Sequence, residues 1–257
     1  MDSVTTISAL GDNYIYLYKC GQNNAFVVDP GIGSSVLSVL EEQDLVLTAA
    51  LATHYHFDHI GGIRDLKKKT GCEVIGPDRN TIPVTGRVVN DKDVLEVCAT
   101  KIQVIATPGH TRDSVCYYLQ PSKDNQSGIL FTGDTLFIGG CGRPIECDAQ
   151  TMWDSLRKIA ALPDDTLVYP GHDYTEENYE FALTIEPNNT TTKKRLQEIK
   201  ELQKQGRLTV PSTIAQEKTT NIFLRADTPE IKIAINMPNA AGAEVFAELR
   251  RRKNVFG

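Results

Sequence analysis

Three histidines and an aspartate lie within six consecutive positions in the segment Thr53-His54-Tyr55-His56-Phe57-Asp58-His59. Such a density of nitrogen and oxygen donors is typical of a metal site rather than of a packed core. The preceding run, residues 45–52, is apolar apart from one threonine and predicts a strand buried on both faces. Gly61-Gly62 and the amphipathic pattern that follows predict a helix that begins close to the metal. The ligands are therefore expected where a strand ends.

The chain has 257 residues, of which 40% are apolar, and a formal net charge of −6. This length can bury a large core in one domain, or in one domain with a smaller appendage. We find neither an apolar run of about 18 residues nor a signal-peptide pattern, so we expect a cytoplasmic protein without membrane association. We also expect a monomer, although the sequence has no feature that sets the oligomeric state. The acidic charge balance argues against a nucleic-acid partner.

Six cysteines are scattered along the chain without a C-x-x-C pair, namely Cys20, Cys72, Cys98, Cys116, Cys141 and Cys147. A chain of this length does not need disulfides to fold, so we expect all six to be reduced. Five of them lie in or beside apolar stretches and are expected to act as small hydrophobic residues. Cys141 lies between two glycines in an expected site loop, and its role stays open.

Strand patterns alternate with loops and helices up to about residue 174. Strands are predicted at 14–18, 25–28, 73–76, 101–106, 115–119, 128–131 and 166–169, and helices at 34–41 and from Asp148 to Ala160. Further helices are expected at about 175–186, 192–205, 213–225 and 239–253. The pattern predicts an α+β domain at 1–173, followed by an α-helical domain at 174–257 that packs directly on it.

The chain has five histidines, and each falls at the end of a predicted strand beside a glycine or a carboxylate. A single histidine is more often a hydrogen-bonded or surface residue than a ligand, but five at such places favour a metal centre. A structural zinc site uses four ligands, whereas the candidates here are His54, His56, Asp58, His59, His110, Asp134 and His172. One ion cannot use seven ligands.

Two ions with a shared carboxylate account for this number of ligands. We assign His54, His56 and His110 to one ion and Asp58, His59 and His172 to the other, with Asp134 as the bridge. Alternate residues of an extended segment point the same way, so the His-x-His pair can share an ion. The donor types favour Zn²⁺, while Fe and Mn remain compatible. Asp58 and Asp134 are classed as the catalytic carboxylates, and Asp29, Thr111 and Asp173 are candidates for orienting the imidazoles.

Longer motifs surround these ligands. The strings Thr-His-x-His-x-Asp-His-x-Gly-Gly, Thr-Pro-Gly-His-Thr, Thr-Gly-Asp-Thr-Leu and Pro-Gly-His within residues 29–172 resemble the metallo-β-lactamase superfamily. Within it, the chain resembles the glyoxalase II (hydroxyacylglutathione hydrolase) family through residues 12–14, 137–143, 172–175 and 221–225 and the terminal Arg250-x-x-Lys253-x-x-Phe256. The resemblance implies an αββα sandwich with a C-terminal helical domain that holds the glutathione part of the substrate.

The resemblance also assigns residues to the thiol moiety of the substrate. Arg143, Tyr174, Arg250 and Lys253 match basic and tyrosine positions of the family's thiol-binding site. Pro144-Ile145 departs from the aromatic pair usual there and removes a tyrosine contact. Without the family match, the run 250–253 could equally be a solvated helix end stabilised by the helix dipole.

The implied reaction is hydrolysis of an S-(2-hydroxyacyl)glutathione, with S-D-lactoylglutathione as the expected substrate and a metal-bridging hydroxide as the nucleophile. One alternative is a persulfide dioxygenase of the same fold, which would use one iron and would consume oxygen with glutathione persulfide. Another is a non-catalytic, metal-stabilised binding module. A β-lactamase is disfavoured without a secretion signal, and a nuclease is disfavoured by the acidic charge balance.

Overall fold

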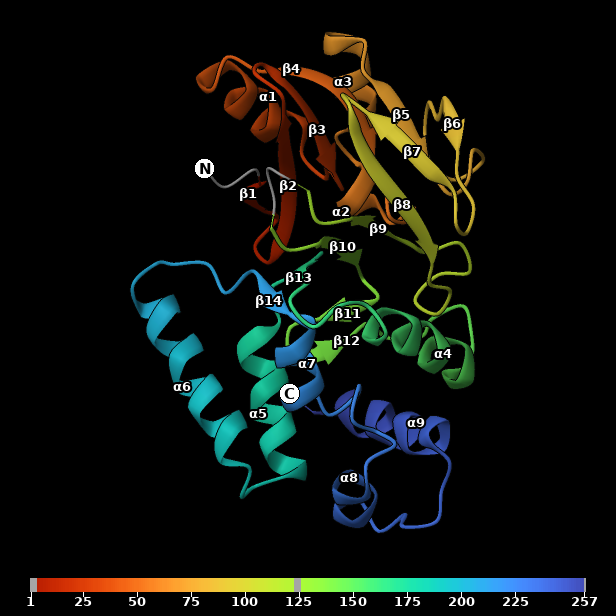
Figure 1. The fold of residues 1–257 in the computed structure, drawn as a ribbon, viewed down its shortest axis with the longest axis vertical. Coiled ribbons are helices and arrows are strands. Elements are labelled where there is room, and N and C mark those ends of the chain that lie inside the picture. The colour runs from red at the N-terminus through yellow and green to blue at the C-terminus, as the bar shows by residue number, and fades with distance from the viewer. Residues whose placement is uncertain (1–3, 123–125, 257) are drawn as a thin grey trace. The chain divides into compact units, whose positions relative to one another are not determined.

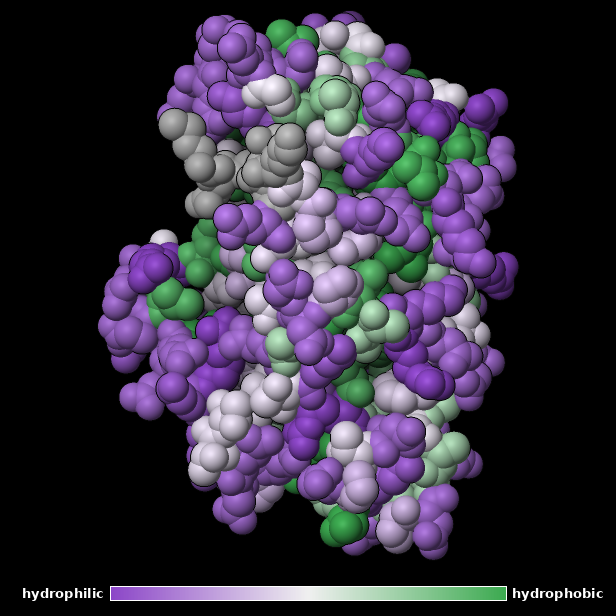
Figure 2. Space-filling view, in the orientation of Figure 1, coloured by the Kyte–Doolittle hydropathy of each residue, from purple (hydrophilic) through white to green (hydrophobic). Residues whose placement is uncertain are grey.

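The computed structural model describes residues 4–122 and 126–256 and divides into two compact units (Figure 1). The first unit comprises residues 1–106 and 113–133, and the second comprises residues 107–112 and 134–257. Within the described residues, no helix is both long and apolar enough to cross a membrane. Hydrophilic side chains cover much of the face drawn in Figure 2.

The first unit contains a mixed sheet whose strands follow one another in chain order. Its strands are β1 (Val4–Ala9), β2 (Asn13–Cys20), β3 (Asn24–Val28), β4 (Val46–Leu51), β5 (Glu73–Gly76) and β6 (Arg87–Val88). The first three strands pair antiparallel, and β3 to β6 pair parallel. The predicted hairpin of β2 and β3 is confirmed, and the predicted buried strand before the histidine motif is β4.

Two helices pack on this sheet, α1 (Gly33–Glu42) and α3 (Ile63–Thr70). Val36 and Leu40 of α1 and Leu66 of α3 are buried in one cluster with Ile15, Leu17 and Val27 of the strands. Both helices therefore expose a polar face and bury an apolar stripe, as the spacing of their apolar residues predicts. A short helix, α2 (Phe57–Ile60), lies between β4 and α3.

A second set of antiparallel strands completes the first unit. It consists of β7 (Val94–Val97), β8 (Thr100–Ala106), β9 (Val115–Leu119) and β10 (Ile129–Gly133). The Tyr16 and Phe131 rings of the two sheets lie 5.4 Å apart, and the hydroxyl of Tyr117 donates to the carbonyl of Ala52 at 2.9 Å. Aromatic side chains thus fill the space between the sheets.

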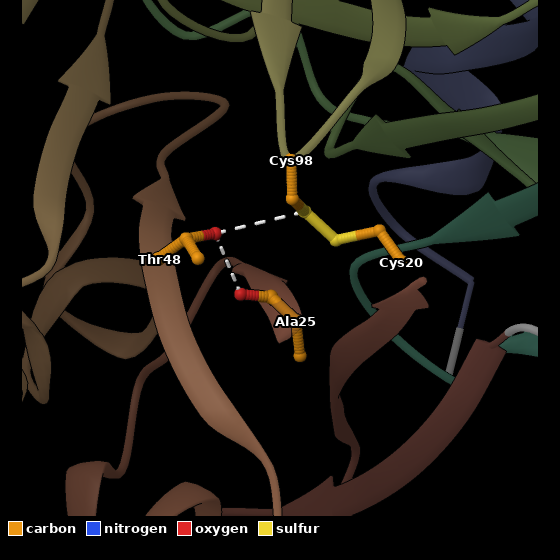
Figure 3. Close-up of a disulfide and its surroundings, with 4 residues drawn as sticks. All are labelled: Cys20, Ala25, Thr48 and Cys98. Carbon is orange, nitrogen blue, oxygen red and sulfur yellow. Dashed lines mark hydrogen bonds between the residues drawn. A yellow bond between two sulfur atoms is a disulfide. The ribbon is translucent and has the colours of Figure 1, made fainter. Parts of the chain in front are cut away.

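A disulfide joins Cys20, at the end of β2, to Cys98, in the turn between β7 and β8 (Figure 3). Their Cα atoms are 6.0 Å apart although 78 positions separate the residues in the chain. The prediction that all six cysteines are reduced is wrong for this pair. Strands of different sheets bring the two thiols together, and no local spacing in the sequence signals that approach.

The second unit is mostly helical. It contains β11 (Leu136–Phe137), β12 (Gly140–Cys141), α4 (Ala149–Ala160), β13 (Leu167–Pro170), α5 (Thr175–Ile185), α6 (Thr190–Lys204), β14 (Ser212–Thr213), α7 (Ile214–Thr220), α8 (Pro229–Ala234) and α9 (Gly242–Lys253). The side chains of Asp148, Asn189 and Thr213 cap α4, α6 and α7.

Two boundaries in this unit differ from the prediction. The helix expected at 213–225 ends at Thr220, because the side-chain oxygen of Asn221 accepts from the backbone N–H of Phe223 and starts a turn. The helix expected from about 239 begins at Gly242, where an ideal Cβ would lie 2.9 Å from the ring of Trp153. Helix α8 was not anticipated.

Candidate metal centre and substrate cleft

Asp29 fixes the start of the histidine motif in the first unit. Its Oδ1 accepts from the backbone N–H of Thr53 at 2.7 Å, and its Oδ2 accepts from the Thr53 hydroxyl at 2.7 Å. That hydroxyl also lies 3.0 Å from Nδ1 of His54. Because it already donates to Asp29, it accepts from a proton on Nδ1, and Nε2 of His54 keeps the lone pair that a metal would use.

His59 is oriented by the same carboxylate. Its Nδ1 lies 3.0 Å from Oδ2 of Asp29, and its Nε2 lies 3.2 Å from Oδ2 of Asp58. The side-chain amide of Asn13 donates to that Asp58 oxygen at 2.8 Å. Asp29 thus contacts His59, as expected of a residue that would orient this imidazole.

The histidine rings of the motif gather closely. The ring centroid of His54 lies 4.7 Å from that of His56 and 4.2 Å from that of His59. Ligand atoms of Asp29, His54 and His59 all lie within 4.8 Å of one another. His54 and His59 are buried, so their imidazoles are preorganised donors rather than mobile surface groups.

Close backbone approach explains a glycine before this motif. A Cβ on Gly31 would lie 1.9 Å from the carbonyl oxygen of Asp58. A Cβ on Gly62 would lie 2.3 Å from the backbone nitrogen of Gly33, at the start of α1. Glycines let the ligand loop and the loop before α1 pack against each other.

In the second unit, the carboxylate of Asp134 faces two imidazoles. Its Oδ2 lies 3.2 Å from Nε2 of His110, and its Oδ1 lies 3.4 Å from Nε2 of His172. Each oxygen of Asp134 thus faces a different histidine, as expected of a carboxylate that bridges two ions. The Nδ1 of His110 lies 2.9 Å from the carbonyl oxygen of Arg143, which holds the proton on Nδ1 and points Nε2 toward Asp134.

Aromatic rings support His172. The ring of Tyr174 stacks on it, with centroids 5.0 Å apart and planes 7° apart. The Phe137 ring lies nearly perpendicular to both rings, with its centroid 5.9 Å from that of His172 and 5.3 Å from that of Tyr174. Tyr174, predicted to bind the thiol moiety, therefore also packs against a ligand candidate.

A cleft of about 490 Å³ opens in the second unit. Its lining includes every residue predicted to bind the thiol moiety, together with two ligand candidates. The lining residues are His110, Asp134, Phe137, Cys141, Gly142, Arg143, Ile145, Tyr174, Glu177, Asn178, Arg250, Lys253, Asn254 and Phe256.

The basic residues of α9 fall into two groups. Arg250 and Lys253 are only 8% and 9% exposed and line the cleft. Arg250 donates to the carbonyl of Cys141 at 2.9 Å and to Oδ1 of Asn254 at 2.7 Å. By contrast, Arg251 is 68% exposed and pairs with Glu248. The solvated helix end considered above describes Arg251 but not the two cleft residues.

Sequence reasoning missed several lining residues. Glu177 forms an ion pair with Lys253, and Asn178 follows it on α5. A turn of helix after Tyr174 could have signalled both residues, because i+3 and i+4 positions share a helix face. Cys141 is buried, and burial raises the pKa of its thiol to about 11, although the nearby Arg250 opposes the shift.

Comparisons with known proteins agree with this picture. The model of the metallo-beta-lactamase superfamily matches residues 9–172, and that of the hydroxyacylglutathione hydrolase C-terminus matches residues 173–256. A hydroxyacylglutathione hydrolase from Rhodospirillum rubrum is 43% identical over 253 residues, covering 97% of each chain. Another from Photobacterium profundum is 43% identical over 259 residues, covering both chains fully. Among solved structures, ETHE1 from Myxococcus xanthus has a TM-score of 0.66 at 28% identity and covers 99% of each chain.

The fold is therefore that of a metallo-β-lactamase superfamily protein, an α+β sandwich with an added C-terminal helical domain. More specifically, the chain belongs to the hydroxyacylglutathione hydrolase family, the glyoxalase II thioester hydrolases. The full-length relatives do not favour the dioxygenase alternative.

Proposed function

We propose that this hydroxyacylglutathione hydrolase cleaves S-D-lactoylglutathione to glutathione and D-lactate at a centre of two divalent metal ions. The observation that carries the proposal is the cleft of the second unit. There the carboxylate of Asp134, which lies beside His110 and His172, shares the lining with three basic residues, Arg143, Arg250 and Lys253. Identity to full-length relatives of that name supports the reaction.

The proposed ligands are His54, His56 and His110 for one ion, Asp58, His59 and His172 for the other, and Asp134 as the bridge. The donor chemistry fits. Hydrogen bonds on Nδ1 direct Nε2 of His54, His59 and His110 toward a ligand role, and the two oxygens of Asp134 face different imidazoles. Nitrogen and oxygen donors without thiolate suit Zn²⁺, our proposed ion, and also accommodate Fe or Mn.

When bound, such ions lower the pKa of a coordinated water to about 7, which supplies a nucleophile at neutral pH. The residues of this chain hold and orient the donors, and Asp58 and Asp134 contribute the negative charge that balances the ions. The leaving group is a thiolate whose solution pKa is near 8.5. It needs little help from a general acid, which agrees with a site whose five histidines are all assigned as ligands.

Glutathione carries two carboxylates and one ammonium group, so it requires local positive charge on a protein whose net charge is −6. Arg143, Arg250 and Lys253 supply that charge in the cleft. Charge-assisted hydrogen bonds of this kind are stronger than neutral ones. Tyr174 adds an aromatic wall beside His172.

We further propose residues 1–173 as the catalytic domain and residues 174–257 as the substrate-binding domain. The junction of the two family models at residues 172 and 173 supports this division. We retain a monomer acting in the cytoplasm without membrane or nucleic-acid partners. The Cys20–Cys98 bond is uncommon for that compartment.

A thioesterase assay tests reaction and specificity together. We expect S-D-lactoylglutathione to be hydrolysed with a higher kcat/KM than lactoyl esters of cysteine or of small thiols without a peptide. Equal rates for all thiols would contradict the role of the basic cleft. Oxygen consumption with glutathione persulfide, in place of thioester cleavage, would instead identify a dioxygenase.

A further inference from the structure

Glu217 is a buried carboxylate that the proposed mechanism does not use. It lies on α7 and is fully shielded from solvent. Its Oε1 accepts from the hydroxyl of Ser212 at 2.5 Å, and its Oε2 accepts from the backbone N–H of Gly139 at 2.8 Å and the side-chain amide of Asn221 at 3.0 Å. Burial raises the pKa of Glu217, and these hydrogen bonds oppose the rise. Burying a carboxylate is costly, so its partners indicate what it holds.

Those partners converge on the tight hairpin of β11 and β12. The amide of Asn221 donates to the carbonyls of Phe137 at 3.3 Å and Gly140 at 2.8 Å. The amide of Asn178 donates to the carbonyl of Ile138 at 3.1 Å. The N–H of Gly139 donates to Glu217. Side chains therefore bond a backbone polar group of every residue from 137 to 140. Short two-residue strands provide few ladder bonds, so this network fixes the hairpin.

The hairpin links the proposed bridging ligand Asp134 to the cleft wall at Cys141. Asp134, the proposed bridging ligand, lies just before it, and an ideal Cβ on Gly142 just after it would lie 1.9 Å from the Asp134 carbonyl oxygen. The carbonyl of Cys141 in β12 accepts from Arg250. A shift of the hairpin would therefore move one wall of the cleft and the acceptor that orients Arg250.

We propose that Glu217 is a positioning residue of the thioester hydrolase, which fixes the 136–141 hairpin and thereby the cleft wall that binds the glutathione moiety. This inference rests on the proposed assignment of the cleft to glutathione. Glu217 does not line the cleft; it acts through Gly139, Asn221 and the strand β12.

The test compares two substitutions of similar volume. Glu217→Gln keeps an oxygen for the Gly139 N–H and for Asn221, while its amide can donate to Ser212. Glu217→Met keeps the volume but removes both acceptors. Ser212→Ala is the matched control, because it removes a partner of Glu217 that does not contact the hairpin. For each variant, kcat and KM are measured with S-D-lactoylglutathione and with a lactoyl thioester that lacks the peptide, alongside the melting temperature and bound metal.

We expect Glu217→Met to raise KM for the glutathione substrate about tenfold, the effect of one or two unsatisfied buried donors, and to change KM for the peptide-free substrate much less. Glu217→Gln should restore KM to within about threefold of wild type, and Ser212→Ala should leave it unchanged. If Glu217→Met does not fold, Glu217→Asp, which withdraws the carboxylate by one methylene, should show the same selective rise in KM.

An unchanged KM in folded Glu217→Met, or equal losses with both substrates, would overturn the inference and leave Glu217 a packing residue. If the wild-type protein itself does not distinguish the two substrates, the assignment of the cleft to glutathione fails instead. The two failures are thus separable.

Discussion

The Nδ1 atom of His110 lies 2.9 Å from the carbonyl oxygen of Arg143. A proposed metal ligand is therefore oriented by the backbone of a residue whose side chain we assign to the substrate. The contact uses the main chain, so the two roles of residue 143 can be separated by substitution.

Arg143→Ala should raise KM for S-D-lactoylglutathione and leave the metal content unchanged, because the carbonyl that orients His110 remains. One charge-assisted hydrogen bond contributes about 1.5 to 3 kcal/mol, and exposure to solvent places the effect near the lower value, about tenfold in KM. Steady-state kinetics and metal analysis of the same preparation check it. If the metal content fell while KM rose, the side chain of Arg143, and not its carbonyl, would be what supports His110 as a ligand.

The number of metal ions provides a second prediction. Seven ligands exceed what one ion uses, so the fully active protein should carry close to two ions per chain. Asp134→Asn should lose more metal and more activity than substitution of a single terminal ligand such as His56, since its carboxylate serves both ions. Full activity with one ion, and retained activity after alanine substitution of Asp58 and His59, would refute the binuclear centre.

Asp29 is expected to raise the metal affinity of the site without binding a metal itself. Its carboxylate bonds both Thr53 and His59, and loss of such an orienting partner typically costs about 10- to 100-fold in metal affinity. Asp29→Asn is therefore expected to lose metal to a chelator at concentrations that wild type withstands. Thr53→Ser, which keeps the hydroxyl, is the matched control. Wild-type chelator resistance in Asp29→Asn would contradict the orienting role.

Lys253 is expected to recognise a carboxylate of the thiol moiety, so Lys253→Ala should raise KM about tenfold with kcat nearly constant. Arg250→Ala should also raise KM, and Arg251→Ala, at an exposed position of the same helix, should not. In the unliganded cleft Lys253 pairs with Glu177, which competes with the substrate carboxylate. Glu177→Gln should therefore lower KM by about two- to fivefold. A higher KM in that variant would show that Glu177 itself binds the substrate.

The Cys20–Cys98 disulfide closes a long loop and should stabilise the fold. A loop of this length corresponds to about 4.5 kcal/mol in the chain-entropy model. Cys20→Ser should lower the free energy of unfolding by up to that amount, and a reductant should lower the stability of wild type but not of the variant. Denaturant titrations with and without reductant measure both. Identical unfolding curves for wild type and Cys20→Ser, each with and without reductant, would show that the disulfide does not contribute to stability.

Motifs and periodicity predicted the strands around the histidines, the hairpin of β2 and β3 and the helices α4, α5 and α6, because each is encoded by local spacing. The cleft positions of Tyr174 and Lys253 required the family resemblance, since no local pattern brings α5 and α9 together. The disulfide, the Lys253–Glu177 pair and the buried Glu217 could not be predicted. Each depends on residues far apart in the chain that only tertiary packing places in contact.

Cys141 lines the cleft that we assign to the glutathione moiety, yet burial raises the pKa of its thiol to about 11. At neutral pH the neutral thiol therefore predominates at this position. Since the thiolate is the reactive form in disulfide exchange, oxidised glutathione would find almost no nucleophile there. We therefore expect Cys141 to exchange slowly with oxidised glutathione, which thiol titration of the folded protein measures.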